Sequence, residues 1–237
     1  MFLDAYYQRD GDTISVSRPQ ASRFAKDIAG DFNPIHDTDA RRFCVPGDLL
    51  FAIVLTHYGL AASMRFHFQH MLSADNPVLL PSDPGETIEL RDHQGACYLS
   101  VARAGSPIKD ADVIERFIRQ YVAFSGHNFP HYLKPLMQAE GVMFNPQRPF
   151  VIYDRMDFEL TNPAMNDPEV GLSDSQLSVQ GRRGDARLDF AIHDGGKPIG
   201  SGSKNLVISG LQPYDDERMA SVIEAFNARR DNHQFGD

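Results

Sequence analysis

The chain has 237 residues, of which 42% are hydrophobic, and a formal net charge of −9. This length suffices for one large domain or two small ones with a buried core. The acidic balance disfavours nucleic acid and anionic membranes as partners, because both bind clustered lysine and arginine. No stretch approaches the about 18 apolar residues of a membrane span, and the N-terminus lacks a signal-peptide pattern. We therefore expect a cytoplasmic protein.

The two cysteines, Cys44 and Cys97, lie far apart and form no metal-like spacing. The simplest interpretation is a pair of buried thiols in a reducing compartment. Cys44 is close to the motif described below, so a reactive role is an alternative to simple burial. We expect no metal ion and no cofactor.

Residues 13–17 alternate in polarity and predict a short strand. A helix should follow, with Pro19 in its first turn. Its apolar side chains share one face at helical spacing and should point at a core: Ala21, Phe24, Ala25 and Ile28. Gly30 can adopt the left-handed conformation common just beyond a helix end, so the helix should stop there.

The stretch from Asp31 to His36 places an acid, an amide and an imidazole within six residues. Pro34 fixes its own φ and disfavours helix at Asn33, so we expect a stiff, non-helical loop. Asp31 and His36 could then share one water molecule and divide proton abstraction and delivery, with Asn33 orienting them. The alternative is an ordinary turn, since Gly, Asp, Asn and Pro are common turn residues.

Phe24, the run Gly30-Asp31-Phe32-Asn33-Pro34-Ile35-His36, and then Asp39 and Ala40 resemble the signature of the MaoC-like, R-specific enoyl-CoA hydratases, a hotdog-fold family. The resemblance implies that Asp31 and His36 correspond to the catalytic pair. In that family the pair activates water for addition to the double bond of an enoyl thioester. A backbone N–H at the start of the family's central helix binds the thioester carbonyl.

The chain departs from this family at the central helix. The family's His-Gly-Met type of run is replaced by an early Val45-Pro46-Gly47-Asp48, which shortens the catalytic loop. We expect the N–H of Gly47 or Asp48 to stabilise the carbonyl oxygen, because a helix N-terminus carries partial positive charge. The alternative is that Asp48 simply caps the helix. The run 39–51 also resembles an uncharacterised bacterial family, which implies no activity.

Residues 47–64 are apolar almost all round and predict a buried central helix. Residues 65–71 should form a strand, on which His67 and His70 face opposite sides and cannot share a metal ion. Further strands are predicted within 77–90 and 96–102. The order of strand, helix, loop, long helix and strands is that of a hotdog unit.

The second half repeats this pattern from about residue 106. A helical stripe over 113–122 leads to the run 125–131, which looks like a degenerate copy of 29–36. Its His127 and His131 could form a second site near His36, or the copy could be purely structural.

A helix over 130–139, strands over 150–160, 172–181, 186–193 and 198–209, and a terminal helix over 215–230 complete the chain. We therefore predict an α+β double hotdog, with antiparallel sheet wrapped around a long central helix, in units 1–105 and 106–237. A fused pair would cover the sheet edge and helix flank of each unit, and a homodimer is left open.

The leading functional hypothesis is hydration or dehydration of an acyl thioester, as a lyase. Asp31 and His36 would activate water, and the apolar helix favours a fatty acyl-CoA or acyl-carrier-protein substrate over a polar one. The alternatives are a hotdog thioesterase and a non-catalytic acyl-thioester-binding protein.

Overall fold

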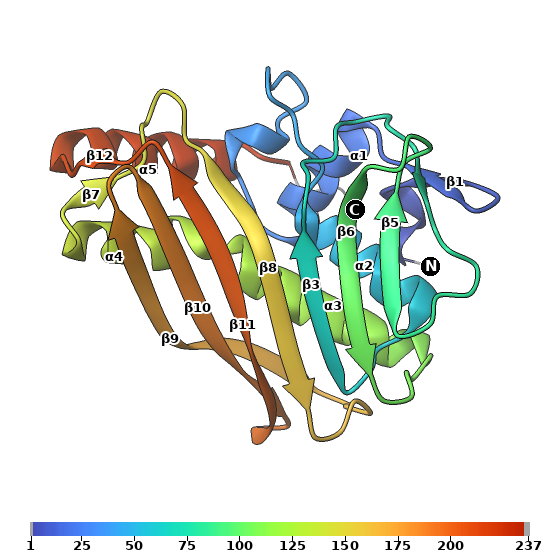
Figure 1. Cartoon of the computed structure of the whole chain (residues 1–237). Helices are drawn as coiled ribbons and strands as arrows, with labels where there is room; N and C mark the ends of the chain where they lie inside the picture. The colour runs from blue at the N-terminus through green and yellow to red at the C-terminus, as the bar shows by residue number, and fades with distance from the viewer. Residues whose placement is uncertain (1, 235–237) are drawn as a thin grey trace.

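The computed structural model describes residues 2–234, in which one large antiparallel sheet curves around a group of helices (Figure 1). In spatial order its ten strands within this range are β1 (Gln8–Asp10), β2 (Thr13–Ser15), β4 (Val78–Leu79), β5 (Thr87–Arg91), β6 (Cys97–Ala104), β3 (Ser63–Phe68), β8 (Val151–Leu160), β11 (Lys197–Ser209), β10 (Arg183–Asp194) and β9 (Pro168–Gln180). A separate pair joins β7 (Val142–Met143) to β12 (Gln212–Pro213).

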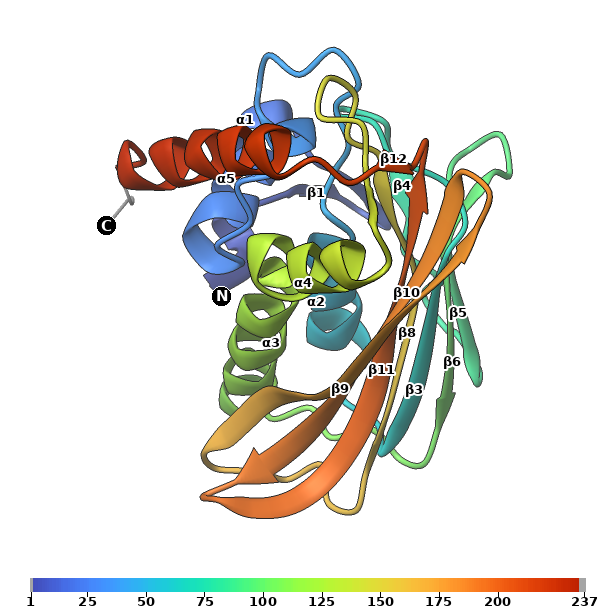
Figure 2. The same ribbon diagram turned by 90° about the vertical axis from the view of Figure 1, so that its left-hand side faces the viewer.

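The helices gather on one face of this sheet, as Figure 2 shows. They are α1 (Arg18–Arg23), α2 (Gly47–Tyr58), α3 (Ala111–Gly126), α4 (Leu133–Ala139) and α5 (Asp216–Asp231). A π-helical turn over Phe24–Ile28 extends α1, and another over Asn128–Tyr132 precedes α4. No helix within residues 2–234 has the length and apolar character to cross a membrane.

The two halves of the chain meet between β3 and β8, where Phe66 pairs with Met156. α2 comes from the first half and α3 from the second. Phe51 of α2 contacts Tyr121 of α3, with ring centroids 4.7 Å apart. Both halves of the chain therefore contribute residues to one hydrophobic core, which lies between the helices and the sheet. The boundary at residue 105 stays a prediction, since sheet and core run continuously across it.

The strong sequence signals correspond to the elements observed. Ser17 and Gln20 form a capping box at the start of α1, which satisfies backbone donors that a helix start leaves free. The predicted stripe over 113–122 lies within α3, and the predicted strands of the second half correspond to β8 to β11.

Several predicted boundaries were wrong. The central helix ends at Tyr58 instead of residue 64, because Gly59 has a φ of +86° and Leu60 forms a bridge with Ile108. Residues 77–90 divide into β4 and β5, and α4 begins only at Leu133. The short strands β1, β7 and β12 were not predicted.

Candidate functional site

The loop after α1 is held by a chain of local hydrogen bonds. Gly30 adopts a φ of +65°, and the N–H of Asp31 returns to the carbonyl of Ala25 at 2.8 Å. The backbone N–H of Asn33 donates to Asp31 Oδ1 at 2.9 Å. Asn33 therefore orients Asp31, but through its backbone instead of its amide.

The Asn33 amide oxygen instead accepts from the N–H of Ile35 at 3.2 Å. This contact caps a single 3-10 turn over Pro34–His36. The expectation of a wholly non-helical loop was wrong for those three residues. The cause is an Asx cap, which stabilises a short turn as readily as a loop.

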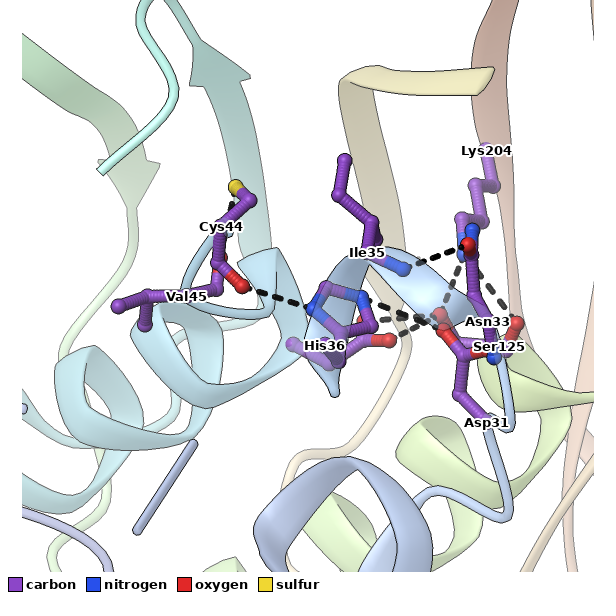
Figure 3. Close-up of polar contacts among 9 residues, drawn as sticks. Asp31, Asn33, Ile35, His36, Cys44, Val45, Ser125 and Lys204 are labelled. Atoms are coloured by element: carbon purple, nitrogen blue, oxygen red, sulfur yellow. Dashed lines mark hydrogen bonds and ion pairs between the residues drawn. The ribbon is translucent and has the colours of Figure 1, made fainter. Parts of the chain in front are cut away.

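His36 lies between two oxygen atoms, as Figure 3 shows. Its Nδ1 is 2.8 Å from the carbonyl oxygen of Cys44, and its Nε2 is 3.5 Å from Asp31 Oδ2. Two acceptors favour the doubly protonated ring, because a neutral imidazole can donate from only one nitrogen. Burial lowers the pKa of His36, but Asp31, the Cys44 carbonyl and Asp48 outweigh it, so the pKa is raised above its usual value.

Asp31 is the acidic partner of His36, and its pKa shifts in the opposite direction. Burial raises the pKa of Asp31, but His36, the Asn33 N–H and Lys204 outweigh that effect, so the pKa is lowered overall. The side chain of Asp31 remains 27% exposed, whereas that of His36 is 10% exposed. The contact therefore favours the carboxylate form of Asp31 and the imidazolium form of His36, and Asp31 is the more exposed of the two.

Both groups border a cavity of about 780 Å³ that is enclosed by segments from both halves of the chain. The lining comes from the 31–36 loop, the first turn of α2, the end of β3, α4, β8, β11 and α5. Much of the wall is apolar and includes Leu50, Leu72, Leu133, Phe144, Leu206 and Phe226. Such a lining suits a ligand that is largely apolar and places a polar group near Asp31.

Gly47 and Asp48 form the start of α2 and line the same cavity. The first N–H groups of any helix lack an acceptor within the helix. A side chain at position 47 would be crowded, because a Cβ built on Gly47 would lie 3.0 Å from Tyr153 Cδ1.

Asp48 does not cap α2, so the alternative that its side chain serves only as a helix cap was wrong. Its carboxylate instead accepts from Ser125 Oγ of α3, at 2.8 Å and 2.6 Å.

Ser125 links Asp48 to a buried lysine that the sequence did not reveal. Lys204 of β11 is 1% exposed, and its Nζ donates to the Oγ of Ser125 and, at 3.3 Å, to its carbonyl oxygen. Burial raises the pKa of Asp48 despite Lys204 and Ser125. Burial also lowers the pKa of Lys204, although Asp48 and Asp31 favour its charged form.

The cluster continues through two tyrosines. The hydroxyl groups of Tyr121 and Tyr153 are hydrogen-bonded, and the Lys204 Nζ lies 4.1 Å above the ring of Tyr153. Burial raises the pKa of both tyrosines well above the usual value, so both hydroxyl groups keep their protons, and one donates to the other.

Other predicted residues lie away from this cluster. His127 and His131 contact each other with ring centroids 5.4 Å apart, but both are exposed and neither lines the cavity. The structure therefore does not bring them to His36.

Cys44 lines the cavity, and burial raises the pKa of its thiol to about 12. Within residues 2–234, no group of three or more His, Cys, Asp or Glu side chains is arranged to hold a metal ion.

Solved structures resemble the fold of this chain. A protein of unknown function with hotdog fold from Alicyclobacillus acidocaldarius superposes with a TM-score of 0.50 at 9% identity, over 90% of this chain and 99% of that one. This match confirms the predicted hotdog fold.

Two weaker structural matches were also found. A tesB protein from Mycobacterium avium subs paratuberculosis has a TM-score of 0.46 at 9% identity, over 87% of this chain and 96% of that one. A MaoC-like dehydratase has a TM-score of 0.42 at 12% identity, over 86% and 98%. No curated protein matches the sequence.

The sequence also matches a family profile over residues 1–217, a range that includes the 31–36 loop, the central helix and Lys204. This match covers more than half of the chain. The chain belongs to the family described as "Protein of unknown function (DUF3581)".

Proposed function

We propose that the protein adds water to the double bond of an enoyl thioester, and catalyses the reverse dehydration. The observation that carries the proposal is the 3.5 Å contact between Asp31 Oδ2 and His36 Nε2 at the wall of a largely apolar cavity. A carboxylate and an imidazolium beside one another supply the base and the acid that hydration needs.

In this proposal the Asp31 carboxylate takes one proton from water while the water oxygen bonds to C3 of the enoyl group. The electrons of the double bond move towards the thioester carbonyl and form an enolate. His36 then delivers its Nε2 proton to C2, and the hydroxyacyl thioester leaves. Asp31 and His36 exchange protons with solvent to return to their starting states.

The enolate oxygen needs a donor, and the first N–H groups of α2, at Gly47 and Asp48, are the proposed ones. The apolar cavity wall favours a substrate whose acyl group is a fatty chain, because that chain would pack against the wall. The carrier of the thioester would be coenzyme A or an acyl-carrier protein.

The test is to assay the wild-type protein and Asp31→Asn with crotonyl-CoA and longer enoyl-CoAs. We expect Asp31→Asn to lose hydration by at least about 100-fold, because the general base is removed. Asp39→Asn is the matched control, since Asp39 is exposed in the following segment. Circular dichroism should show the same fold for all three proteins. Full activity in Asp31→Asn would refute the assignment.

The same samples distinguish the competing functions. A hydrolase would direct the water at the carbonyl carbon and release free thiol, which a thiol assay detects. An acyl-thioester-binding protein without activity would retain acyl-CoA and change neither signal.

A further inference from the structure

Lys204 is a buried cation that the proposed mechanism has not yet used. It belongs to β11 but points to the helix side of the sheet, towards the loop that carries Asp31 (Figure 3). The side chain is 1% exposed and forms part of the cavity wall. A lysine is almost never buried to this degree unless its charge has a partner.

One of the three N–H groups of the Lys204 ammonium group lacks an oxygen acceptor among the described residues. A lysine has three N–H donors, and the oxygen atoms that accept from Lys204 both belong to Ser125. The face of the Tyr153 ring, 4.1 Å from Nζ, adds cation–π attraction, but it is a weaker partner than an oxygen atom. The third N–H thus has no oxygen acceptor within the described part of the protein.

Contacts among β11, α3 and α2 hold the ammonium group of Lys204 in place. Ser125 of α3 holds the ammonium group, and the same hydroxyl donates to Asp48 in the first turn of α2. Lys204 is therefore tied to the start of α2, where the sequence predicted the oxyanion site. It also lies close enough to Asp31 for its charge to lower the pKa of that carboxyl.

The charges of the cluster argue for a neutral ligand group that becomes negative during the reaction. The cluster holds two acids, Asp31 and Asp48, and two bases, His36 and Lys204, so its formal charges balance without a ligand. A permanently anionic ligand group would leave an uncompensated charge in a buried site, which is costly. A carbonyl oxygen adds no charge in the ground state and gains it only in the transition state, where a buried cation stabilises it most.

We propose that Lys204 is a catalytic residue that donates a hydrogen bond to the carbonyl oxygen of the thioester. This inference rests on the proposed function, because it takes an acyl thioester as the ligand. During hydration, the electron pair displaced from the double bond reaches the carbonyl oxygen, and Lys204 stabilises it without giving up a proton. The proton at C2 still comes from His36. Lys204 would compensate for the altered Val45-Pro46-Gly47 run at the start of α2.

The test compares two ligands that differ at a single group. One is a saturated acyl-CoA, and the other is its thioether analogue, in which a methylene replaces the thioester carbonyl. We expect Lys204→Met to weaken acyl-CoA binding by about tenfold or more, the usual range for a hydrogen bond to a charged group. Binding of the thioether should change by less than about twofold, since the lost contact involves only the carbonyl.

Lys197→Met is the matched control, because Lys197 is exposed on the same strand, and it should leave both affinities unchanged. Lys204→Gln retains an N–H donor and should restore part of the difference, which also covers the case that Lys204→Met folds poorly. With an enoyl-CoA substrate, Lys204→Met should lower kcat by about 100-fold to 1,000-fold, the loss expected for one oxyanion donor.

Equal losses for both ligands in Lys204→Met, or no loss for either, would overturn the inference. Failure of the wild-type protein to bind either ligand would overturn it as well. Selective loss of acyl-CoA binding in a protein that does not hydrate enoyl-CoA would support the Lys204 contact and refute only the proposed reaction.

Discussion

Gly126, the last residue of α3, packs against Ala29, the residue before Gly30. A Cβ built on Gly126 would lie 1.8 Å from the carbonyl oxygen of Ala29. The two residues belong to the runs 29–36 and 125–131, which we predicted to be a motif and its degenerate copy. The two runs contact each other, and the second supplies Ser125 to the polar cluster at the cavity.

Replacing Gly126 with alanine should destabilise the protein by about 2–3 kcal/mol or more, because the nearest atoms are backbone and cannot rotate away. Helix propensity alone would predict the opposite, a gain of up to about 1 kcal/mol. Urea unfolding followed by circular dichroism measures the difference. Gly171→Ala is the control, since no atom lies within 4 Å of its Cβ. A Gly126→Ala protein as stable as wild type would contradict the packing.

Ser125 separates two buried charged groups, and its removal should be costly. Ser125→Ala leaves Asp48 and Lys204 without the hydroxyl they share, so we expect a loss of about 2–4 kcal/mol in the free energy of unfolding. Ser203→Ala is the matched control. Ser203 also donates to a carboxylate, Asp157, at 3.0 Å, but that carboxylate is only half-buried, so about 1 kcal/mol should be lost.

The same contact should appear as coupling in a double-mutant cycle. In a Lys204→Met background, Ser125→Ala should cost at least about 1 kcal/mol less than it does in the wild type, because the ammonium group it supports is already gone. Additive effects of the two changes would show that Ser125 does not couple to Lys204.

The Asp31–His36 pair could be predicted from the sequence because its parts are local. Gly30, Pro34 and Asn33 fix the backbone between them, and those effects act over a few residues. The buried α2 could be predicted for a similar reason, as its apolar residues are contiguous. Its end could not, because Leu60 leaves the helix to pair with Ile108, a partner 48 positions away.

The roles of Lys204 and Ser125 could not be predicted: nothing near Lys204 marks it, and the run 125–131 drew notice for its histidines and not for the Ser125 hydroxyl. A lysine in a strand usually faces solvent. Whether it faces the core depends on strand register and on the bulge between Asn205 and Leu206 in the pairing with β8. Ser125 lies beyond the apolar stripe that predicted α3, and only the packing of α2 against α3 brings it to Asp48.

Cys44 should be a slow nucleophile although it borders the cavity. Burial raises the pKa of its thiol to about 12, and the thiol donates to the carbonyl of Val45 at 3.2 Å. Since the thiolate is the reactive form, iodoacetamide at neutral pH should leave Cys44 unmodified, as read by peptide mass spectrometry. The same treatment in urea should alkylate it. Rapid alkylation of Cys44 in the folded protein would contradict this prediction and support a reactive role for the thiol.

The Asp31–His36 pair should make stability depend on pH in a defined direction. The folded-state pKa of His36 is raised, so its contribution is complete below the ordinary value of 6.5 and is lost as pH rises through the folded-state pKa. The folded-state pKa of Asp31 is lowered, so its contribution is present above 3.8 and is lost as pH falls through its folded-state pKa. Both contributions are therefore present between pH 3.8 and 6.5.

His36→Gln tests this sign, because glutamine is neutral and cannot form the ion pair. The stability gap between wild type and His36→Gln, from urea unfolding, should be larger at about pH 5.5 than at about pH 9. His67→Gln, at an exposed position on β3, should show no such change. A gap that stays constant would mean that folding does not raise the pKa of His36, and a gap that widens with pH would mean that folding lowers it. A neutral His36 that donates from Nδ1 to the Cys44 carbonyl would carry no proton on Nε2 to give to C2, and the acid in the proposed hydration would have to be another group.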